Sequence, residues 1–390
     1  MLHIRLPKEI RNQVLPGALP AGDKKPTVFV GMSGGVDSST SALLLKEAGY
    51  DVVGVFIKVW SPDWLPCNWR DEQRDAMRVA ADLNIPFFTF DFEEEYKRDV
   101  VDYMISEYKQ GRTPNPDVMC NRSIKFGSFW TKARDMGAHY IATGHYAQIK
   151  KLDNSELRIS NSESIRNPQS TIPQYELLAG ADPNKDQSYF LWTLTQEDLA
   201  HTLFPIGHLT KPEVRAYAKE KNLFVADKKD SQGICFLGTI DLKEFLKYYL
   251  KPVPGKVLDE TGRELGTHEG SILFTIGEAI PLGGLPSKMF VIAKDLEKNT
   301  LTVSPSRPHE LESAQKNVNL VGTNWISKIP AIDDTVSART RYRQPLENAT
   351  IKDIESTEAT IMFEKSQLVA PGQSTVFYQG DVCLGGGIIE

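Results

Sequence analysis

Residues 31–38, which read Gly-Met-Ser-Gly-Gly-Val-Asp-Ser, constrain the fold of this 390-residue chain more than any other stretch. Residues 27–30 are all β-branched or aromatic and predict a short buried parallel strand. Residues 39–49 have an apolar face and stop at a glycine, which predicts a helix. In such a strand-to-helix turn, free backbone N–H groups and the positive end of the helix dipole converge, and glycines allow close approach. The turn therefore predicts a site for an anion such as a phosphate.

The glycine turn matches neither of the two commonest nucleotide-binding patterns. No Gly-Lys-Ser/Thr follows it, and it lacks the Gly-x-Gly-x-x-Gly spacing. It resembles the Ser-Gly-Gly-x-Asp-Ser loop of the ATP pyrophosphatase superfamily, whose members release pyrophosphate from ATP and adenylate a substrate oxygen. A turn that only joins a strand to a helix is the simpler alternative. The flanking hydroxyls, the added Asp37 and the strand–helix context favour the phosphate loop.

The first half of the chain alternates between strand and helix patterns. Strands are expected at 51–60, 86–90 and 139–143, and helices at 70–84, 93–109 and 124–136. This alternation predicts a parallel sheet covered on both faces. Ligands of such sheets bind beyond the carboxyl ends of the strands, where residues 31–38, the segment after Trp60 and residues 144–146 are expected to lie together.

The character of the sequence changes near residue 250, where glycines and prolines begin to punctuate short β-like runs. The expected fold class is α/β, with a parallel doubly wound nucleotide-binding domain followed by two small β-rich domains, the last a β-barrel. The expected boundaries are an N-terminal extension over 1–26, the catalytic domain over 27–245, a central β-rich domain over 246–305 and the barrel over 306–390. The polar stretch 151–175 is expected to form a hairpin or a loose insertion.

Composition and cysteine spacing limit the possible functions. The formal net charge is −6, so binding to RNA would have to rest on local basic patches. No apolar run is long enough for a membrane helix and no secretory signal is evident, which favours a cytoplasmic location without membrane contact. The four cysteines contain no Cys-x-x-Cys pair, which argues against a structural metal site and a disulfide scaffold. They are Cys67, Cys120, Cys235 and Cys383.

Two cysteines lie in segments that suggest reactive thiols. Cys120 follows Asp117 and two prolines, which are interpreted as stiffening an extended loop. It is expected just before the helix at 124–136, where a helix N-terminus lowers a thiol pKa. A buried loop cysteine is the alternative. Cys235 lies between apolar residues, so a core cysteine is its alternative, although two lysines and several glycines nearby suggest an ordered loop that can move.

Six segments together make the resemblance to a family specific. They are 33–38, 115–121, 142–146, 185–188, 230–236 and 371–373, and they occur in the order seen in the tRNA-specific 2-thiouridylase family. The similarity extends from residue 27 to the end of the chain. It implies ATP-dependent thiolation of C2 of the wobble uridine, position 34, in tRNA: the base is adenylated and sulfur is then transferred from a cysteine persulfide. It also implies two partners, the tRNA anticodon stem-loop and a sulfur-relay protein or cysteine desulfurase.

The resemblance also implies roles for individual residues. Cys235 would carry the persulfide, Cys120 would complete sulfur release through a transient disulfide with Cys235, and Asp117 would act as an acid–base group. ATP would bind to Gly31, Met32, Ser33, Gly34, Gly35, Val36, Asp37, Ser38, Ile57 and Gly144. The tRNA and its target base would contact Asn115, Pro116, Asp117, His145, Lys185, Asp186, Gln187, Arg341, Tyr342 and Gln373. Mg²⁺ is expected to accompany ATP, without a dedicated carboxylate cage in the protein.

The basic cluster of Arg339, Arg341 and Arg343 suits contact with RNA phosphates, although charges that protect a strand edge are the alternative. Residues 275–281, Thr-Ile-Gly-Glu-Ala-Ile-Pro, lack the two basic residues that many family members have there, which puts a tRNA contact at this place in doubt.

Two other functions compete with uridine thiolation. One is another adenylating enzyme, such as an amidotransferase-type synthetase or a cytidine thiolase, and the other is a non-catalytic nucleotide- or RNA-binding module. An amide-forming ligase needs neither thiol, and an iron–sulfur thiolase would be expected to show Cys-x-x-Cys. The presence of Asp37, Cys120 and Cys235 argues against a module without activity.

Overall fold

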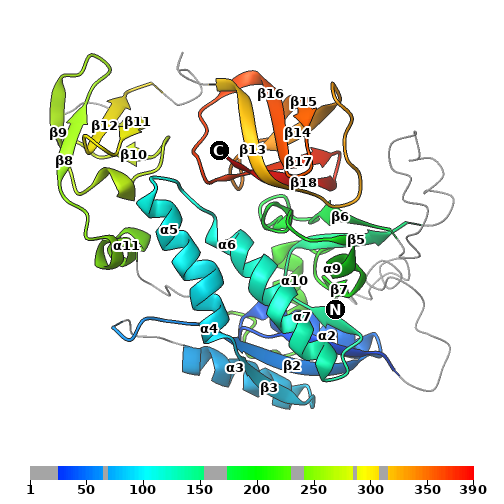
Figure 1. Ribbon diagram of the computed structural model, residues 1–390. Coiled ribbons are helices and arrows are strands. Elements are labelled where there is room, and N and C mark those ends of the chain that lie inside the picture. The colour runs from blue at the N-terminus through cyan, green and yellow to red at the C-terminus, as the bar shows by residue number, and fades with distance from the viewer. Residues whose placement is uncertain (1–24, 65–68, 153–173, 230–240, 284–287, 307–314) are drawn as a thin grey trace.

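The computed structural model describes residues 25–64, 69–152, 174–229, 241–283, 288–306 and 315–390 (Figure 1). The expected extension over 1–26 therefore lies almost entirely outside the described residues, as do Cys67 and Cys235. The described part holds three sheets, one parallel, one mixed and one closed into a barrel. This arrangement confirms the predicted fold class.

The parallel sheet has the strand order β3-β2-β1-β4-β7, and all of its pairings are parallel. Its strands are β1 (Thr27–Gly31), β2 (Asp51–Lys58), β3 (Phe87–Asp91), β4 (Tyr140–Ala142) and β7 (Thr202–Leu203). Parallel pairing brings the carboxyl ends of β1, β2 and β4 to one edge. The edge predicted to collect the site residues is therefore present.

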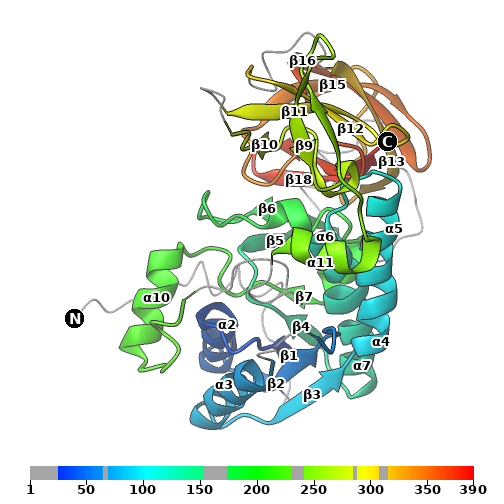
Figure 2. The same ribbon diagram turned by 90° about the vertical axis from the view of Figure 1, so that its left-hand side faces the viewer.

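Helices cover both faces of this sheet (Figures 1 and 2). On one face lie α2 (Val36–Glu47), α3 (Trp69–Asp82) and α10 (Lys211–Glu220); on the other lie α4 (Glu93–Tyr96), the π-helical segment 97–102, α5 (Tyr103–Lys109), α6 (Pro116–Met119), the π-helical segment 120–128 and α7 (Phe129–Asp135). Two apolar clusters follow this division, because alternate residues of a strand point to opposite faces. Val28 and Val30 pack with α2 and α10, whereas Phe29 packs with α5 and α7.

The helix that carries Cys120 begins earlier than the sequence predicted. Residues 116–135 form one continuous helical run, so Cys120 lies inside the helix and not before it, and the predicted start at 124 is wrong. The run begins at 116 because the Asn115 side chain caps it, with Oδ1 accepting from the Val118 N–H at 3.4 Å, and because proline suits the first helical position. The two prolines had been interpreted as features of an extended loop.

The remaining elements belong to the nucleotide-binding domain, the central sheet and the barrel. The rest of the first half comprises β5 (Ala147–Lys151), β6 (Tyr175–Ala179), the 3₁₀ turn 188–190 and α9 (Gln196–Ala200), and α11 (Leu242–Leu250) leads to the central sheet. The central sheet has the order β10-β11-β12-β8-β9. Its members are β8 (Gly255–Leu258), β9 (Glu264–His268), the 3₁₀ turn 271–273, β10 (Ala279–Ile280), β11 (Met289–Asp295) and β12 (Thr300–Ser304).

The last body is a closed antiparallel barrel, because β13 pairs with both β16 and β18. Its strands are β13 (Gln315–Trp325), β14 (Thr335–Arg339), β15 (Glu347–Ile354), β16 (Glu358–Gln367), β17 (Ser374–Gln379) and β18 (Val382–Ile389). The hairpin β5–β6 from the first half extends this sheet by pairing with β18, at Val382 with Leu178 and Cys383 with Leu177. In the described part of the chain, no helix is both long enough and apolar enough to cross a membrane.

Candidate functional site

The glycine turn between β1 and α2 has the geometry of an anion site. Gly35 caps α2 in an extended conformation and, within the described residues, no side chain caps this helix end. Its first N–H groups therefore remain available to a ligand. Gly34 has φ +71°, and a Cβ there would lie 2.4 Å from the Glu72 carbonyl oxygen. Only glycine allows the turn to pack this closely against α3.

Residues from three neighbouring strand ends surround this turn. A Cβ built on Gly31 would lie 3.7 Å from Ile57 Cδ1, and one built on Gly144 would lie 2.8 Å from the backbone nitrogen of Ser38. Ser38 Oγ accepts a hydrogen bond from the Ser33 N–H at 3.2 Å. The structure thus brings together Gly31, Ile57, Gly144 and the turn itself, which are the residues predicted to bind ATP.

Lys211 is a charged group at this turn that the sequence reasoning missed. Its Nζ lies 2.8 Å from both carboxylate oxygens of Asp37, and the Tyr146 hydroxyl donates to Asp37 Oδ1 at 2.7 Å. Lys211 is the first residue of α10, which begins after a capping box formed by Thr210 and Glu213. A cation is disfavoured at a helix N-terminus, and this was the available signal that the side chain serves another purpose.

A second cation lies near the same turn, and the residues present fit a nucleotide polyphosphate. Lys228 Nζ donates to the Gly34 carbonyl at 3.0 Å and lies 2.6 Å from Asp75 Oδ2. Backbone N–H groups, small residues and two ammonium groups are suited to phosphate oxygens. Among the described residues, no group of three His, Cys, Asp or Glu side chains could hold a metal ion. Any Mg²⁺ here would be held largely by the phosphates.

Asp117 and Cys120 lie in the first turns of the helical run 116–135, which reaches the glycine turn through Phe129, 3.7 Å from a Cβ built on Gly31. Burial raises the pKa of Asp117 above its usual range, and the cation of Lys125 partly offsets this effect. Cys120 is only 3% exposed and belongs to the apolar cluster that also contains residues of α5 and α7. Its predicted partner Cys235 is not among the described residues.

His145 links this helical run to the glycine turn. It follows Gly144 directly, its ring lies 5.8 Å from that of Phe126, and its Nδ1 is 2.7 Å from Thr143 Oγ1. Burial lowers the pKa of His145 far below its ordinary value, with a further lowering by Lys125. The imidazole is therefore neutral, and Lys125 acts electrostatically on both Asp117 and His145.

Residues 185–187 make mainly internal contacts in this structure. Asp186 is 6% exposed, accepts from the N–H groups of Gly180 and Ser188 at 3.0 Å each, and pairs with Arg339 at 2.6 Å. Gln187 Oε1 accepts from the Tyr146 N–H at 3.0 Å. Lys185 is half-buried. The basic cluster around Arg339 is therefore partly used to join the first half of the chain to the barrel.

Arg341, Tyr342 and Gln373, which the resemblance predicted as tRNA contacts, contact three different segments, and of these contacts only that of Gln373 is with residues 111–115. Arg341 donates to the Ile276 carbonyl, and burial lowers its pKa. Tyr342 packs on Phe190 with ring centroids 4.5 Å apart. Gln373 Nε2 donates to the Thr113 carbonyl at 2.7 Å.

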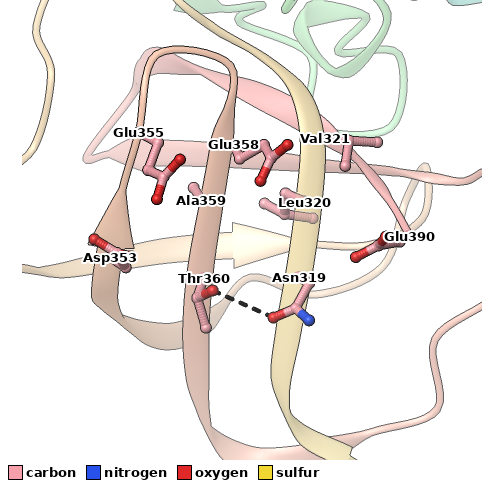
Figure 3. Close-up of a pocket in the computed structure, with 9 residues that line it drawn as sticks. All are labelled: Asn319, Leu320, Val321, Asp353, Glu355, Glu358, Ala359, Thr360 and Glu390. Atoms are coloured by element: carbon pink, nitrogen blue, oxygen red, sulfur yellow. Dashed lines mark hydrogen bonds between the residues drawn. The ribbon is translucent and has the colours of Figure 1, made fainter.

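A pocket of about 160 Å³ lies elsewhere on the barrel, between β13, β15 and β16 (Figure 3). Four acidic residues line it: Asp353, Glu355, Glu358 and Glu390. None of the predicted site residues lies in this pocket. A group of carboxylates repels phosphates, so this pocket does not suit a phosphate-bearing ligand.

Comparison with known proteins covers nearly the whole chain. Family models match three consecutive parts: a tRNA methyl transferase HUP domain over 26–239, a tRNA methyl transferase PRC-barrel domain over 243–305 and an aminomethyltransferase beta-barrel domain over 316–389. The tRNA-specific 2-thiouridylase MnmA of Halalkalibacterium halodurans is 44% identical over 369 residues, which are 93% of this chain and 94% of that protein. The chain belongs to the tRNA-specific 2-thiouridylase family.

Further relatives agree with this membership, which confirms the resemblance read from the motifs. The MnmA of Streptococcus thermophilus is 43% identical over 378 residues, 94% of this chain and 96% of that protein. Among solved structures, the U34-tRNA thiolase NcsA of Methanococcus maripaludis is 15% identical, with a TM-score of 0.35 over 63% of this chain and 71% of that one. That likeness is too low to support an argument about function.

Proposed function

We propose that this protein is an ATP-dependent tRNA uridine 2-sulfurtransferase that thiolates C2 of the wobble uridine. The observation that carries the proposal is the continuity of the site. His145 follows Gly144 of the glycine turn and lies beside the helix of Asp117 and Cys120, and Lys125 acts electrostatically on both Asp117 and His145. The turn, the half-buried Asp117 carboxyl and the buried Cys120 thiol therefore lie on connected elements, which supports adenylation followed by sulfur transfer.

The chemistry explains why both parts are needed. The C2 oxygen of uridine is a poor leaving group, and ATP supplies the adenylate that allows it to leave. The turn at 31–38, with Ile57 and Gly144, would hold the triphosphate and orient its α-phosphorus toward the base. Asn115, Pro116 and Asp117 would hold the flipped-out uridine, and Asp117 would exchange a proton with it.

The two thiols would then complete the transfer. The outer sulfur of a Cys235 persulfide attacks C2, and AMP departs with the former O2. The Cys120 thiolate next attacks the Cys235 sulfur, which leaves the new sulfur on the base and forms a Cys120–Cys235 disulfide. A thiol reductant restores both cysteines. The persulfide would come from a sulfur-relay protein or cysteine desulfurase, and a cytoplasmic location suits a tRNA substrate.

Contacts to the tRNA are assigned as part of the same proposal. His145, residues 185–187, Arg341 and Tyr342 would border the anticodon stem-loop. The descriptions of two family models mention methyl transfer, whereas the relatives are named for thiolation. The Cys120 and Cys235 pair favours thiolation, because methyl transfer to a base does not require a persulfide.

The decisive experiment measures transfer of labelled sulfur to unmodified tRNA in the presence of ATP and a cysteine desulfurase, with nucleoside mass spectrometry as readout. We expect ATP-dependent 2-thiouridine from the wild type and a loss of at least about 100-fold for Cys120→Ala and for Cys235→Ala. Cys383→Ala is the matched control, because burial raises the pKa of Cys383 to about 12 and keeps it a thiol. Binding of ATP and tRNA without any thiolated base would refute the proposal.

A further inference from the structure

Residues 111–115, which lead into the helix of Asp117 and Cys120, are held by the barrel through a short turn at 370–373. The Thr113 N–H donates to the Pro371 carbonyl at 2.7 Å. Gln373 Nε2 donates back to the Thr113 carbonyl at 2.7 Å and lies 3.5 Å from the Pro114 carbonyl. Both backbone groups of Thr113 are thus bound by a segment about 260 residues later in the chain.

The turn that makes these bonds is itself fixed. The Gly372 N–H donates to the Ile389 carbonyl at 2.8 Å, and the Ile389 N–H donates to the Gln373 carbonyl at 2.8 Å. Gly372 has φ +90°, and a Cβ there would lie 2.9 Å from the Thr113 nitrogen. The turn therefore approaches Thr113 as closely as backbone packing allows, and its register is set by the last strand of the barrel.

The central sheet holds the same segment from another side. Thr113 Oγ1 donates to Thr275 Oγ1 at 3.3 Å. Gly111 has φ +75°, and a Cβ there would lie 2.4 Å from Leu296 Cδ1. Residues 111–115 are therefore enclosed between two bodies that contribute none of the residues proposed to do the chemistry.

We propose that Gln373 is a positioning residue, which holds residues 113–115 so that Asn115 and Asp117 face the target uridine. This inference rests on the proposed function for its catalytic meaning. The Gln373 amide donates to the Thr113 carbonyl, so we expect its effect on the reaction to pass through the loop. It differs from the expectation that Gln373 binds the tRNA directly, and the two roles predict different measurements.

The test compares Gln373→Met with Gln196→Met. Gln196 is a matched control, because its Nε2 also donates to a barrel carbonyl, that of Ile326 at 2.7 Å, but it does not touch residues 111–115. For Gln373→Met we expect the single-turnover rate of thiolation to fall about tenfold, the effect of one lost hydrogen bond, while the Kd for tRNA changes less than twofold. Amide hydrogen exchange should rise at Thr113, Asn115 and Asp117, the residues of this stretch that carry an amide hydrogen. Gln196→Met should leave both the rate and this exchange unchanged.

Gly372→Ala is a second variant, in case Gln373→Met does not fold. It disturbs the turn at the Thr113 nitrogen without removing the Gln373 amide, and the same pattern is expected. A tenfold weaker Kd for tRNA, with unchanged amide exchange in residues 113–117, would overturn the proposal in favour of direct contact with the tRNA. Equal losses of rate in Gln373→Met and Gln196→Met would overturn it in favour of a general effect of domain packing. Absence of thiolation by the wild type would instead refute the proposed function, and the exchange measurement would still decide whether Gln373 holds the loop.

Discussion

The two halves of the proposed site are built in different ways. The phosphate turn is made from contiguous residues at 31–38 between β1 and α2, supported by the ends of adjacent strands. The loop before Asp117 is held by Thr275 and Gln373, which are 162 and 260 residues away from Thr113. The turn itself is therefore built from one short stretch of sequence, whereas the loop that leads to Asp117 is held by residues far later in the chain.

This difference has a consequence for the order of events in folding. The α2 N-terminus and its turn can form once the parallel sheet has paired. The contacts to Thr113 require β18 to be in place, because Gly372 and Gln373 are bonded to Ile389. We expect the protein to bind ATP under conditions that loosen the barrel, but to lose thiolation under the same conditions.

The largest effect is expected from Gly144→Ala, which tests whether ATP binding depends on the close packing of the neighbouring strand end against the phosphate turn. The added Cβ would lie 2.8 Å from the Ser38 nitrogen and 3.0 Å from the Asp37 carbonyl carbon, and it would enter the space at the start of α2. ATP affinity should fall about 100-fold, or about 2.8 kcal/mol, by calorimetric titration. Gly266→Ala is the control, because its Cβ would meet only Leu282 Cδ2 at an ordinary 3.6 Å. Equal ATP affinity in both variants would show that Gly144 does not border the nucleotide.

An intermediate effect, on the free energy of unfolding, is expected from the ion pair of Asp37 and Lys211, which joins the turn to α10. In a double-mutant cycle of Asp37→Asn and Lys211→Met, we expect a coupling free energy of about 2 kcal/mol in urea unfolding, because the side chains are 31% and 10% exposed. The exposed pair Lys97 and Asp102, at 3.1 Å, is the control and should couple by less than about 1 kcal/mol. Additive effects of the two substitutions would mean that the pair does not stabilise the turn.

The same contrast explains what could be predicted from the sequence. The strand–turn–helix at 27–47 was predictable because strand propensity, glycine spacing and the helix pattern lie within one short stretch. The helix start at 116 was missed, although Asn115 followed by a proline is a local cap signal, because the two prolines were interpreted as an extended loop.

The long-range contacts were not predictable from local patterns. No pattern in the sequence pairs Gln373 with Thr113 or Lys211 with Asp37, because these contacts depend on how the sheets close and pack. Family resemblance named Gln373 as important, but only the geometry shows that its amide binds the loop. Cys235, which the proposed reaction needs, lies outside the described residues and stays a prediction.

The smallest effect is expected on the pH dependence of the free energy of unfolding, and it comes from the charge of Asp117. Burial raises its pKa when the protein is folded, so the folded state binds the proton more tightly than the unfolded state, whose pKa is about 3.9. Proton binding by Asp117 therefore stabilises the folded state at low pH. This stabilisation is lost as the pH rises from the pKa of Asp117 in the unfolded state through its pKa in the folded state. Asp117→Asn should become progressively more stable than the wild type over that interval in urea titrations from about pH 3 to pH 8.

Asp37→Asn provides the comparison that makes this result specific to the enclosed loop. Its carboxylate is compensated by Lys211 at 2.8 Å, so removal of the charge should destabilise the protein at neutral pH, the opposite sign. If Asp117→Asn and Asp37→Asn shift stability in the same direction at pH 7, Asp117 is not held in a desolvated position by the packing around it. Opposite signs would establish that the turn stabilises the charge of Asp37, whereas the packing around Asp117 destabilises the charged form of its carboxyl.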